Sequence, residues 1–203
     1  MIASLITVSI ETAVFTLLYL LLKTFDKDYK GLFPGKPEYG MIAGYLLFTS
    51  IPIWIYRTDP VTDMLLGVVF GCFLTVMFFD QMTKLVSDWI YIPIVLCGIV
   101  LMVRNGTNVW ILINLVLFIF LQFVVFKRTY GLSDTFAFSS LGIVFAGVGL
   151  DMVAMLTAMV FAYTYLIFVQ SIKKNISRSF RLIEPKAFLP YIGYAFLHTL
   201  ILL

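Results

Sequence analysis

Long apolar stretches alternate with short polar segments along the whole chain. Each apolar stretch runs for roughly 15–21 residues, and none shows the in–out alternation of a barrel strand. In hydrocarbon, only helices and closed barrels satisfy every backbone hydrogen bond. The pattern therefore predicts an all-α, polytopic transmembrane bundle of about eight spans. The predicted spans are about 2–22, 40–56, 63–79, 89–103, 109–126, 134–149, 151–170 and 187–203.

The composition agrees with this pattern. The chain of 203 residues is 62% hydrophobic and 12% charged, with a mean hydropathy of +1.03. Soluble domains carry about twice that share of charged residues, roughly 25%. We therefore expect residues 1–203 to form a single membrane domain whose main partner is the lipid bilayer. The first stretch has no basic segment before it and no small-residue cleavage site, which favours a retained span over a signal peptide.

The basic residues predict the orientation of the spans. If the loop 23–39 is cytoplasmic, twelve of the 14 Lys and Arg residues fall on the cytoplasmic side, and only Arg57 and Arg104 fall outside. Both termini then lie on the outer side of a cell membrane. Asp80 closes the third span and Asp134 opens the sixth, so both lie at the cytoplasmic boundary. The two spans between them run out and back, which allows the two carboxylates to meet.

Two neighbouring aspartates are a candidate catalytic pair. A carboxylate at a membrane boundary costs free energy unless it has a partner or a task. Two close carboxylates share one proton, so one can activate water while the other protonates a peptide carbonyl. Gly131 would leave room for a substrate backbone near Asp134. The alternative interpretation is that Asp134 is a helix cap or first-turn residue, with Ser133 as the other candidate for the cap, and that Asp80 is a solvated helix end.

The remaining acidic residues have weaker claims to a catalytic role. Asp88, after Ser87, is expected to cap the fourth span, with an auxiliary role in the site as the alternative. Glu11 lies in the middle of the first span, where a polar contact with another helix would satisfy it. Asp59 and Asp151 are expected to be ordinary loop or cap residues on the outer face, as is Asp63.

Several other kinds of chemistry find little support. His198, the single histidine, is expected to be a hydrogen-bonded packing residue, and no histidine base is predicted on the cytoplasmic side for a Ser or Cys nucleophile. Cys72 and Cys97 lie in apolar stretches without a CxxC pair, so neither a metal site nor a disulfide framework is predicted. A net charge of +3, without a basic run that includes exposed aromatics, does not point to nucleic acid.

Three segments, in order, carry a family resemblance. Phe79–Ile90 ends one span on Asp80 and opens the next span after a short loop. Residues 130–134 read Tyr-Gly-Leu-Ser-Asp, and residues 188–192 read Phe-Leu-Pro-Tyr-Ile after a basic loop. With two spans between the aspartates, these segments resemble the type IV prepilin peptidase family, which are membrane aspartic peptidases with a GxGD motif. The resemblance covers about residues 63–203.

The resemblance implies an activity and a set of site residues. Residues 63–203 would be the peptidase core, with Asp80 and Asp134 as the catalytic dyad. The substrate would be a prepilin-like or pseudopilin protein, cut after its basic leader at the cytoplasmic face without a metal or cofactor. The residues expected to bind substrate or shape the site are Gly131, Ser133, Asp88 and Pro190.

The chain also departs from the family pattern. Ser133 stands in place of the second glycine of GxGD, Phe136 where a lysine is frequent, and Ser87 where a proline is common. The loop 23–39 has no cysteine, whereas larger members carry paired CxxC motifs linked to N-methylation of the cleaved pilin. Methyltransferase activity is therefore not expected.

Three alternatives stay open. One is a catalytically degenerate scaffold of the same fold, and another is a presenilin-like protease, although in that class the two aspartates lie on adjacent spans. The third is a small carrier, for which Glu11, Asn114 and Gln122 are the polar candidates near mid-membrane.

Overall fold

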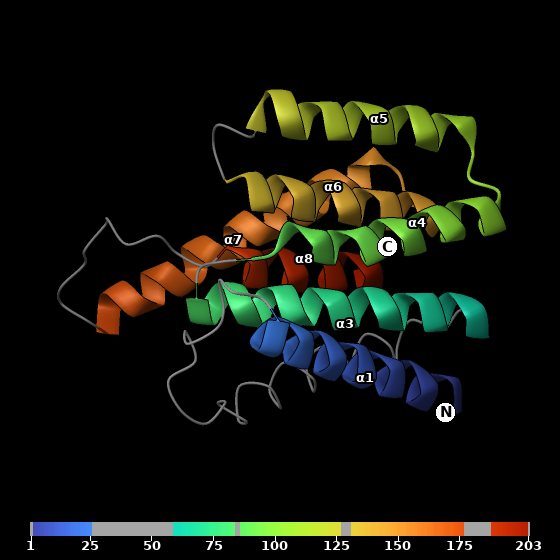
Figure 1. Ribbon diagram of the computed structural model, residues 1–203. Coiled ribbons are helices and arrows are strands. Elements are labelled where there is room, and N and C mark those ends of the chain that lie inside the picture. Colours follow the sequence, from blue (N-terminus) through green and yellow to red (C-terminus); the bar gives the residue numbers. More distant parts are fainter. Residues whose placement is uncertain (1, 26–58, 84–85, 127–130, 177–187, 203) are drawn as a thin grey trace.

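The computed structural model describes residues 2–25, 59–83, 86–126, 131–176 and 188–202. These residues form seven α-helices and one short 3₁₀ helix, with no strand among them (Figure 1). Seven predicted spans appear as helices within a few residues of their expected bounds. The other predicted span, 40–56, lies outside the described residues. The elements are α1 (Ile2–Phe25), α3 (Pro60–Thr83), η1 (Asp88–Ile90), α4 (Tyr91–Asn105), α5 (Val109–Val124), α6 (Leu132–Gly147), α7 (Met152–Ile176) and α8 (Leu189–Leu202).

Several helices are apolar and long enough to cross a membrane. Within the described part of the chain, four stretches qualify by length and composition, and α5 and α6 are apolar but shorter. This arrangement fits a multi-pass membrane protein, while the count of eight spans stays a prediction. The four stretches are Thr7–Thr24, Pro60–Thr83, Asp88–Asn105 and Met152–Ser171.

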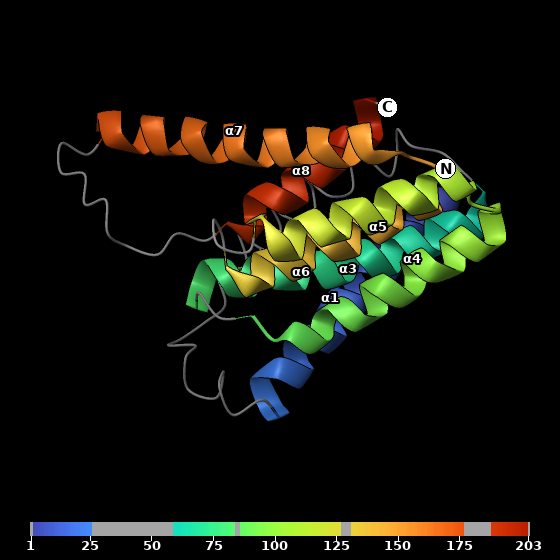
Figure 2. The same ribbon diagram turned by 90° about the horizontal axis from the view of Figure 1, so that it is seen from above.

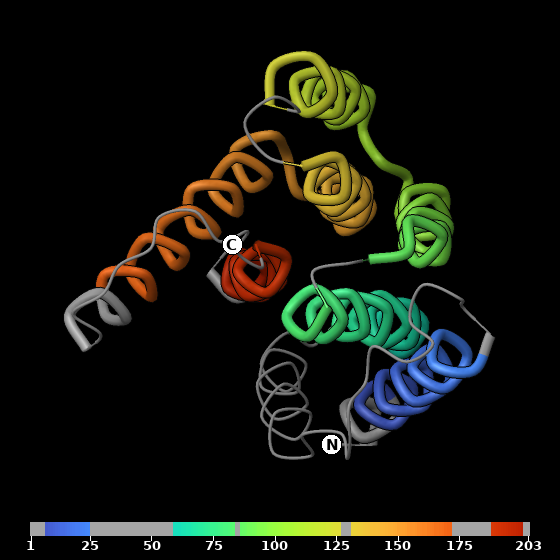
Figure 3. Tube along the Cα trace, turned by 60° about the vertical axis from the view of Figure 1, so that its left-hand side comes forward, coloured from blue at the N-terminus to red at the C-terminus, as the bar shows by residue number. Residues whose placement is uncertain are grey.

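Four helices surround the centre of the bundle. Figure 3 shows α3, α4, α6 and α8 as a ring, with α1, α5 and α7 outside it. Among the outer helices, α1 packs mainly on α3, α5 on α6 and α7 on α8. Every residue of α3 from Leu66 to Phe79 is buried except Val68, so this part of α3 is enclosed by protein. Phe196 of α8 lies at the centre of these four helices. The centroid of its aromatic ring is 4.7 Å from that of Phe145 in α6.

The helices from α3 to α8 alternate in direction. As a result α3, α5 and α7 end, and α4, α6 and α8 begin, at the same end of the bundle (Figures 1 and 2). Asp80 lies in the last turn of α3 and Asp134 in the first turn of α6. The alternation therefore places both aspartates at that shared end, which we call the aspartate end.

Glycines allow the closest helix–helix contacts. Gly98 of α4 and Gly147 of α6 face one another, and a Cβ on Gly147 would lie 2.6 Å from the Leu101 Cβ and 2.8 Å from the Gly98 carbonyl oxygen. On the other side of α3, a Cβ on Gly71 would lie 2.7 Å from the backbone oxygen of Glu11 in α1. Small residues of this kind let helices approach where apolar burial alone gives no driving force between them.

Polar contacts fasten the opposite end of the bundle. Asp59 accepts hydrogen bonds from the backbone N–H groups of Val61 and Thr62, at 3.0 and 3.2 Å, and so caps α3. Arg104 at the end of α4 forms an ion pair with Asp59 at 2.5 Å. Asn105 donates to the carbonyl oxygen of Gly147 at 2.7 Å, which satisfies the last turn of α6. The expectation that Asp59 is a cap residue is confirmed.

We expect acid to destabilise this end of the bundle by protonating Asp59. Its hydrogen bond from the Thr62 hydroxyl, with further help from Arg104, lowers the pKa of Asp59 well below the ordinary 3.8. A depressed pKa in the folded state adds stability that is complete above the ordinary value and is lost as the pH falls below it. We expect the melting temperature in detergent to fall below about pH 4, and to fall less steeply in Asp59→Asn. Parallel pH profiles for the two proteins would contradict this assignment.

Candidate functional site

Asp80 joins the end of α3 to the start of α8. Its Oδ2 accepts the backbone N–H of Leu189, the first residue of α8, at 3.1 Å. The first N–H groups of a helix have no partner within the helix, and a negative charge is favourable beside them. The next residue, Pro190, is buried and has no N–H to satisfy, so it suits the first turn. The sequence candidates Asp80 and Pro190 therefore lie at one junction.

Asp134 occupies the third position of α6. Its Oδ2 accepts the backbone N–H of Gly131 at 3.3 Å, so the carboxylate closes the first turn. Gly131 itself is the cap residue of the helix, with φ −65° and ψ 167°. The prediction of Asp134 as a first-turn residue is confirmed. The alternative that Ser133 or Asp134 is the cap is wrong, because the chain enters α6 through Gly131.

The two carboxyl groups lie close enough to interact electrostatically. They approach from opposite sides of the ring, since Asp80 comes from α3 and Asp134 from α6. The helices that pack between α3 and α6 are α4 on one side and α8 on the other. This arrangement is visible in Figure 3, where α4 and α8 lie between α3 and α6 on the two sides of the ring.

Tyr91 lies beside the aspartates on α4. Its hydroxyl is 3.1 Å from the Ser133 Oγ, and its side chain is only 4% exposed. The same hydroxyl lies within electrostatic range of Asp134, Asp80 and Asp88. The ring stacks on Phe136, with the two ring centroids 6.2 Å apart. Tyr91 is thus a buried side chain that contacts Ser133 and lies near the three aspartates of the predicted site.

Aromatic rings lie beneath the carboxylates. Tyr163 of α7 interacts electrostatically with Asp134. The Tyr163 ring lies 5.1 Å from the ring of Phe188, which in turn lies 6.1 Å from the ring of Phe138 in α6. These contacts bring α6, α7 and the start of α8 together under the aspartates and give the site an apolar base.

Asp88 lies at the edge of the site. It is exposed and is the first residue of η1, while Ser87 is the residue that precedes the helix. Asp88 therefore begins a separate 3₁₀ turn, and α4 starts only after that turn, at Tyr91. The expectation that Asp88 caps the fourth span is wrong. Asp88 lies within electrostatic range of the Tyr91 hydroxyl, at the margin of the site.

Three other polar residues that the sequence singled out lie in other parts of the helices, away from the contacts described above. His198 follows Leu189 by nine positions, about 13 Å along α8. It hydrogen-bonds to the Tyr165 hydroxyl and stacks against that ring, so the expectation of a hydrogen-bonded packing residue is confirmed. Gln122 donates to the Met159 sulfur at 3.1 Å. Glu11 is fully buried on α1, facing α3.

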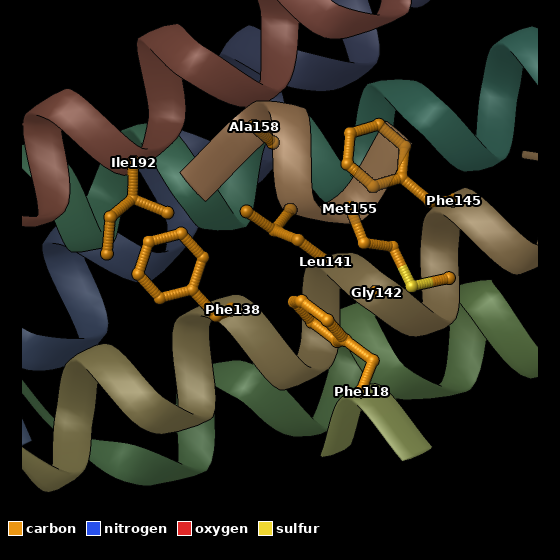
Figure 4. A pocket seen from close by; sticks show the side chains of 8 residues that line it. All are labelled: Phe118, Phe138, Leu141, Gly142, Phe145, Met155, Ala158 and Ile192. Carbon is orange, nitrogen blue, oxygen red and sulfur yellow. The ribbon is translucent and has the colours of Figure 1, made fainter. Parts of the chain in front are cut away.

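A small cavity lies between α5, α6, α7 and α8 (Figure 4). Its walls are entirely apolar, which leaves nothing in it to orient a polar substrate. Phe138 belongs both to this cavity and to the aromatic base of the aspartate site. The residues that line the cavity are Phe118, Phe138, Leu141, Gly142, Phe145, Met155, Ala158 and Ile192.

Sequence reasoning missed Tyr91, Tyr163 and the backbone of Leu189 as site residues. A signal existed for Tyr91, because a tyrosine at the start of an apolar helix must find a partner for its hydroxyl when buried. No comparable signal marks Leu189, whose contribution is a backbone N–H group. Tyr163 reaches the site only because α7 packs along α8.

The chain was compared with models of known families, with curated proteins and with solved structures. No family model matches it, and no curated protein and no solved structure is significantly similar to it.

Proposed function

We propose that the protein is an aspartic endopeptidase that cuts prepilin-like membrane proteins after their basic leader. One observation carries the proposal: Asp80 in the last turn of α3 and Asp134 in the first turn of α6, which are 54 positions apart in the sequence, lie at the same end of a helical bundle. The sequence resemblance to the type IV prepilin peptidases supports the same pair. Serine or cysteine catalysis would need a histidine base, and the single histidine, His198, lies about 13 Å along α8 from the Leu189 N–H that Asp80 binds.

The chemistry follows from the pair. Two like charges in a poorly hydrated setting hold one proton between them. The ionised carboxylate takes a proton from a water molecule, whose oxygen then attacks the peptide carbonyl carbon, while the other carboxyl gives its proton to the carbonyl oxygen. When the tetrahedral intermediate collapses, the carboxyl that took the proton from water gives it to the leaving nitrogen, the peptide C–N bond breaks, and a hydroxyl of the intermediate returns its proton to the other carboxylate. The carboxyl groups end with one shared proton, as they began.

The proposed orientation places this reaction at the cytoplasmic boundary. With about eight spans and both termini outside, twelve basic residues and both aspartates face the cytoplasm of a cell membrane. A prepilin-like substrate would lay its apolar helix beside the spans and keep its basic leader in the cytoplasm. The bond to be cut then lies at the depth of the aspartates.

The decisive experiment is cleavage of a prepilin-like probe in cells. The probe carries a basic leader, one apolar helix and a C-terminal epitope, and it is expressed with the wild-type protein or with the double variant D80N/D134N. We expect a shortened probe only with the wild type, with equal amounts of both proteins in the membrane fraction. Mass spectrometry then locates the cut. A cut inside the apolar helix would favour the presenilin-like alternative over a leader peptidase.

A catalytically silent scaffold is the second candidate, and one observation favours it. Both carboxylates have structural tasks, because Asp80 accepts the Leu189 N–H and Asp134 accepts the Gly131 N–H. A scaffold needs nothing more from them. The probe experiment separates the two functions, since a scaffold leaves the probe intact with either protein.

Gly131 offers a test of where the substrate backbone lies. Of the atoms in the described part of the chain, a Cβ at this position would meet only the Asp134 Oδ2, at an ordinary contact distance of 3.7 Å. Because glycine is the better cap residue, Gly131→Ala should lower the free energy of unfolding by at most about 1 kcal/mol. If the substrate passes over this residue, the same variant should slow cleavage at least about tenfold. Cleavage at the wild-type rate would show that the substrate lies elsewhere.

A further inference from the structure

The structure gives Ser133 a partner that its sequence position does not predict. In the GxGD pattern this position is a glycine, which can contribute no side-chain contact. Here the Ser133 Oγ lies 3.1 Å from the hydroxyl of Tyr91, which belongs to a different helix, 42 positions earlier. Ser133 immediately precedes Asp134, so this contact holds the backbone of α6 one residue away from the carboxylate.

Tyr91 is rigidly packed and can therefore restrain the first turn of α6. Its side chain is almost fully buried and its ring stacks on Phe136, so its own position is determined by packing. A buried hydroxyl needs a hydrogen-bond partner, and Ser133 supplies it. The helices that carry the two residues are also held close together by Gly98 and Gly147. The first turn of α6, which otherwise has few hydrogen bonds of its own, is thereby tied to α4.

We propose that Tyr91 is a positioning residue, which acts through its hydrogen bond to Ser133 to hold Asp134 at working distance from Asp80. The serine hydroxyl provides a link to α4 that a glycine at this position could not make. The expected effect on cleavage rests on the proposed function, whereas the expected effect on the Asp134 carboxyl does not.

The cleavage test uses variants that remove one hydroxyl at a time. Tyr91→Phe and Ser133→Ala should each lower kcat about five- to tenfold and leave KM unchanged, because neither hydroxyl touches the substrate. The double variant should be no slower than the slower single variant, since both changes break the same bond. Ser133→Thr keeps the hydroxyl and should restore most of the rate. Tyr165→Phe removes a hydrogen-bonded hydroxyl away from the aspartates and is the matched control, with kcat unchanged.

A second measurement is independent of activity. In detergent, the carbon signals of ¹³C-labelled aspartate carboxyls can be titrated, and D134N identifies the Asp134 signal by its disappearance. Among the described residues, the titratable groups that interact with this carboxyl are Asp80 on α3, Tyr91 on α4 and Tyr163 on α7. Tyr91→Phe and Ser133→Ala should displace its titration midpoint by about half a unit, and Tyr165→Phe should not.

The two measurements together distinguish a failure of the positioning proposal from a failure of the proposed peptidase function. A displaced midpoint with slower cleavage supports the proposal. A displaced midpoint in a protein that cleaves no probe also supports it and counts against the proposed function instead. If the wild type cleaves and both single variants keep its rate, or if neither variant displaces the Asp134 midpoint, Tyr91 is not a positioning residue.

Discussion

Asp134→Asn should lower the rate of leader cleavage by at least about a thousandfold, which is the upper part of the range for losing a general acid or base. Asparagine cannot take a proton from water or share one with Asp80. Its amide oxygen can still accept the Gly131 N–H that Asp134 accepts at 3.3 Å, so the first turn of α6 should keep its geometry. Asp80→Asn should have the same effect, since its amide oxygen can still accept the Leu189 N–H. The measurement is the initial rate of probe cleavage at equal membrane levels of each protein.

Asp151→Asn is the matched control for both variants. Asp151 caps α7 at the opposite end of the bundle, with hydrogen bonds from the N–H groups of Val153 and Ala154 at 2.9 and 3.3 Å. Asparagine is as good a cap as aspartate, so this variant removes one negative charge without disturbing the helix. It should cleave at the wild-type rate. Normal cleavage by the Asp134 variant would rule out the dyad, and a lost rate in the Asp151 variant would mean that overall charge is responsible.

Gly147→Ala should destabilise the protein by about 1–3 kcal/mol, because the new methyl group has no space. Its Cβ would lie 2.6 Å from the Leu101 Cβ and 2.8 Å from the Gly98 carbonyl oxygen. Both belong to α4 itself rather than to the far end of a flexible side chain, so α4 and α6 must move apart. Alanine favours helix over glycine by about 1 kcal/mol, which makes a net loss the more informative result.

Unfolding in detergent, followed by circular dichroism during titration with a denaturing detergent, measures this loss. Gly131→Ala makes the same chemical change at a position where, among the described residues, the new Cβ has only an ordinary contact, and it provides the comparison. If the Gly147 variant is as stable as the Gly131 variant, then the close contact between α4 and α6 is not tight in solution.

The helices were predictable because hydrocarbon permits so few backbone structures. An apolar stretch that crosses a membrane must make its hydrogen bonds internally, so its length marks its ends within a few residues. Which helix is central was not predictable. The membrane-crossing windows of α3 and α7 have the same mean hydropathy, 2.1, yet 78% of the first and 28% of the second are buried. Lipid and protein interior are both apolar, so hydropathy cannot distinguish a helix that faces one from a helix that faces the other.

The site was predictable only in its coarsest feature. Counting spans was enough to bring Asp80 and Asp134 to one end, since each span reverses the direction of the chain. The groups that hold them were not predictable, because they come from distant segments: the Leu189 N–H lies 109 positions from Asp80. Ser133 shows the same limit. Its local sequence suggested a helix cap, and a hydroxyl 42 positions away engages it instead.

The polar contacts at the end opposite the aspartates hold three helices of the bundle together there. There, Asp59, Arg104 and Asn105 join α3, α4 and α6 through an ion pair and hydrogen bonds. If these helices change their tilt relative to one another, we expect them to pivot about that end. A helix of 15 residues such as α4 is about 22 Å long, so a rotation of about 5° there displaces its other end by about 2 Å. A movement that leaves the fastened end almost unchanged is therefore enough to separate Tyr91 from Ser133.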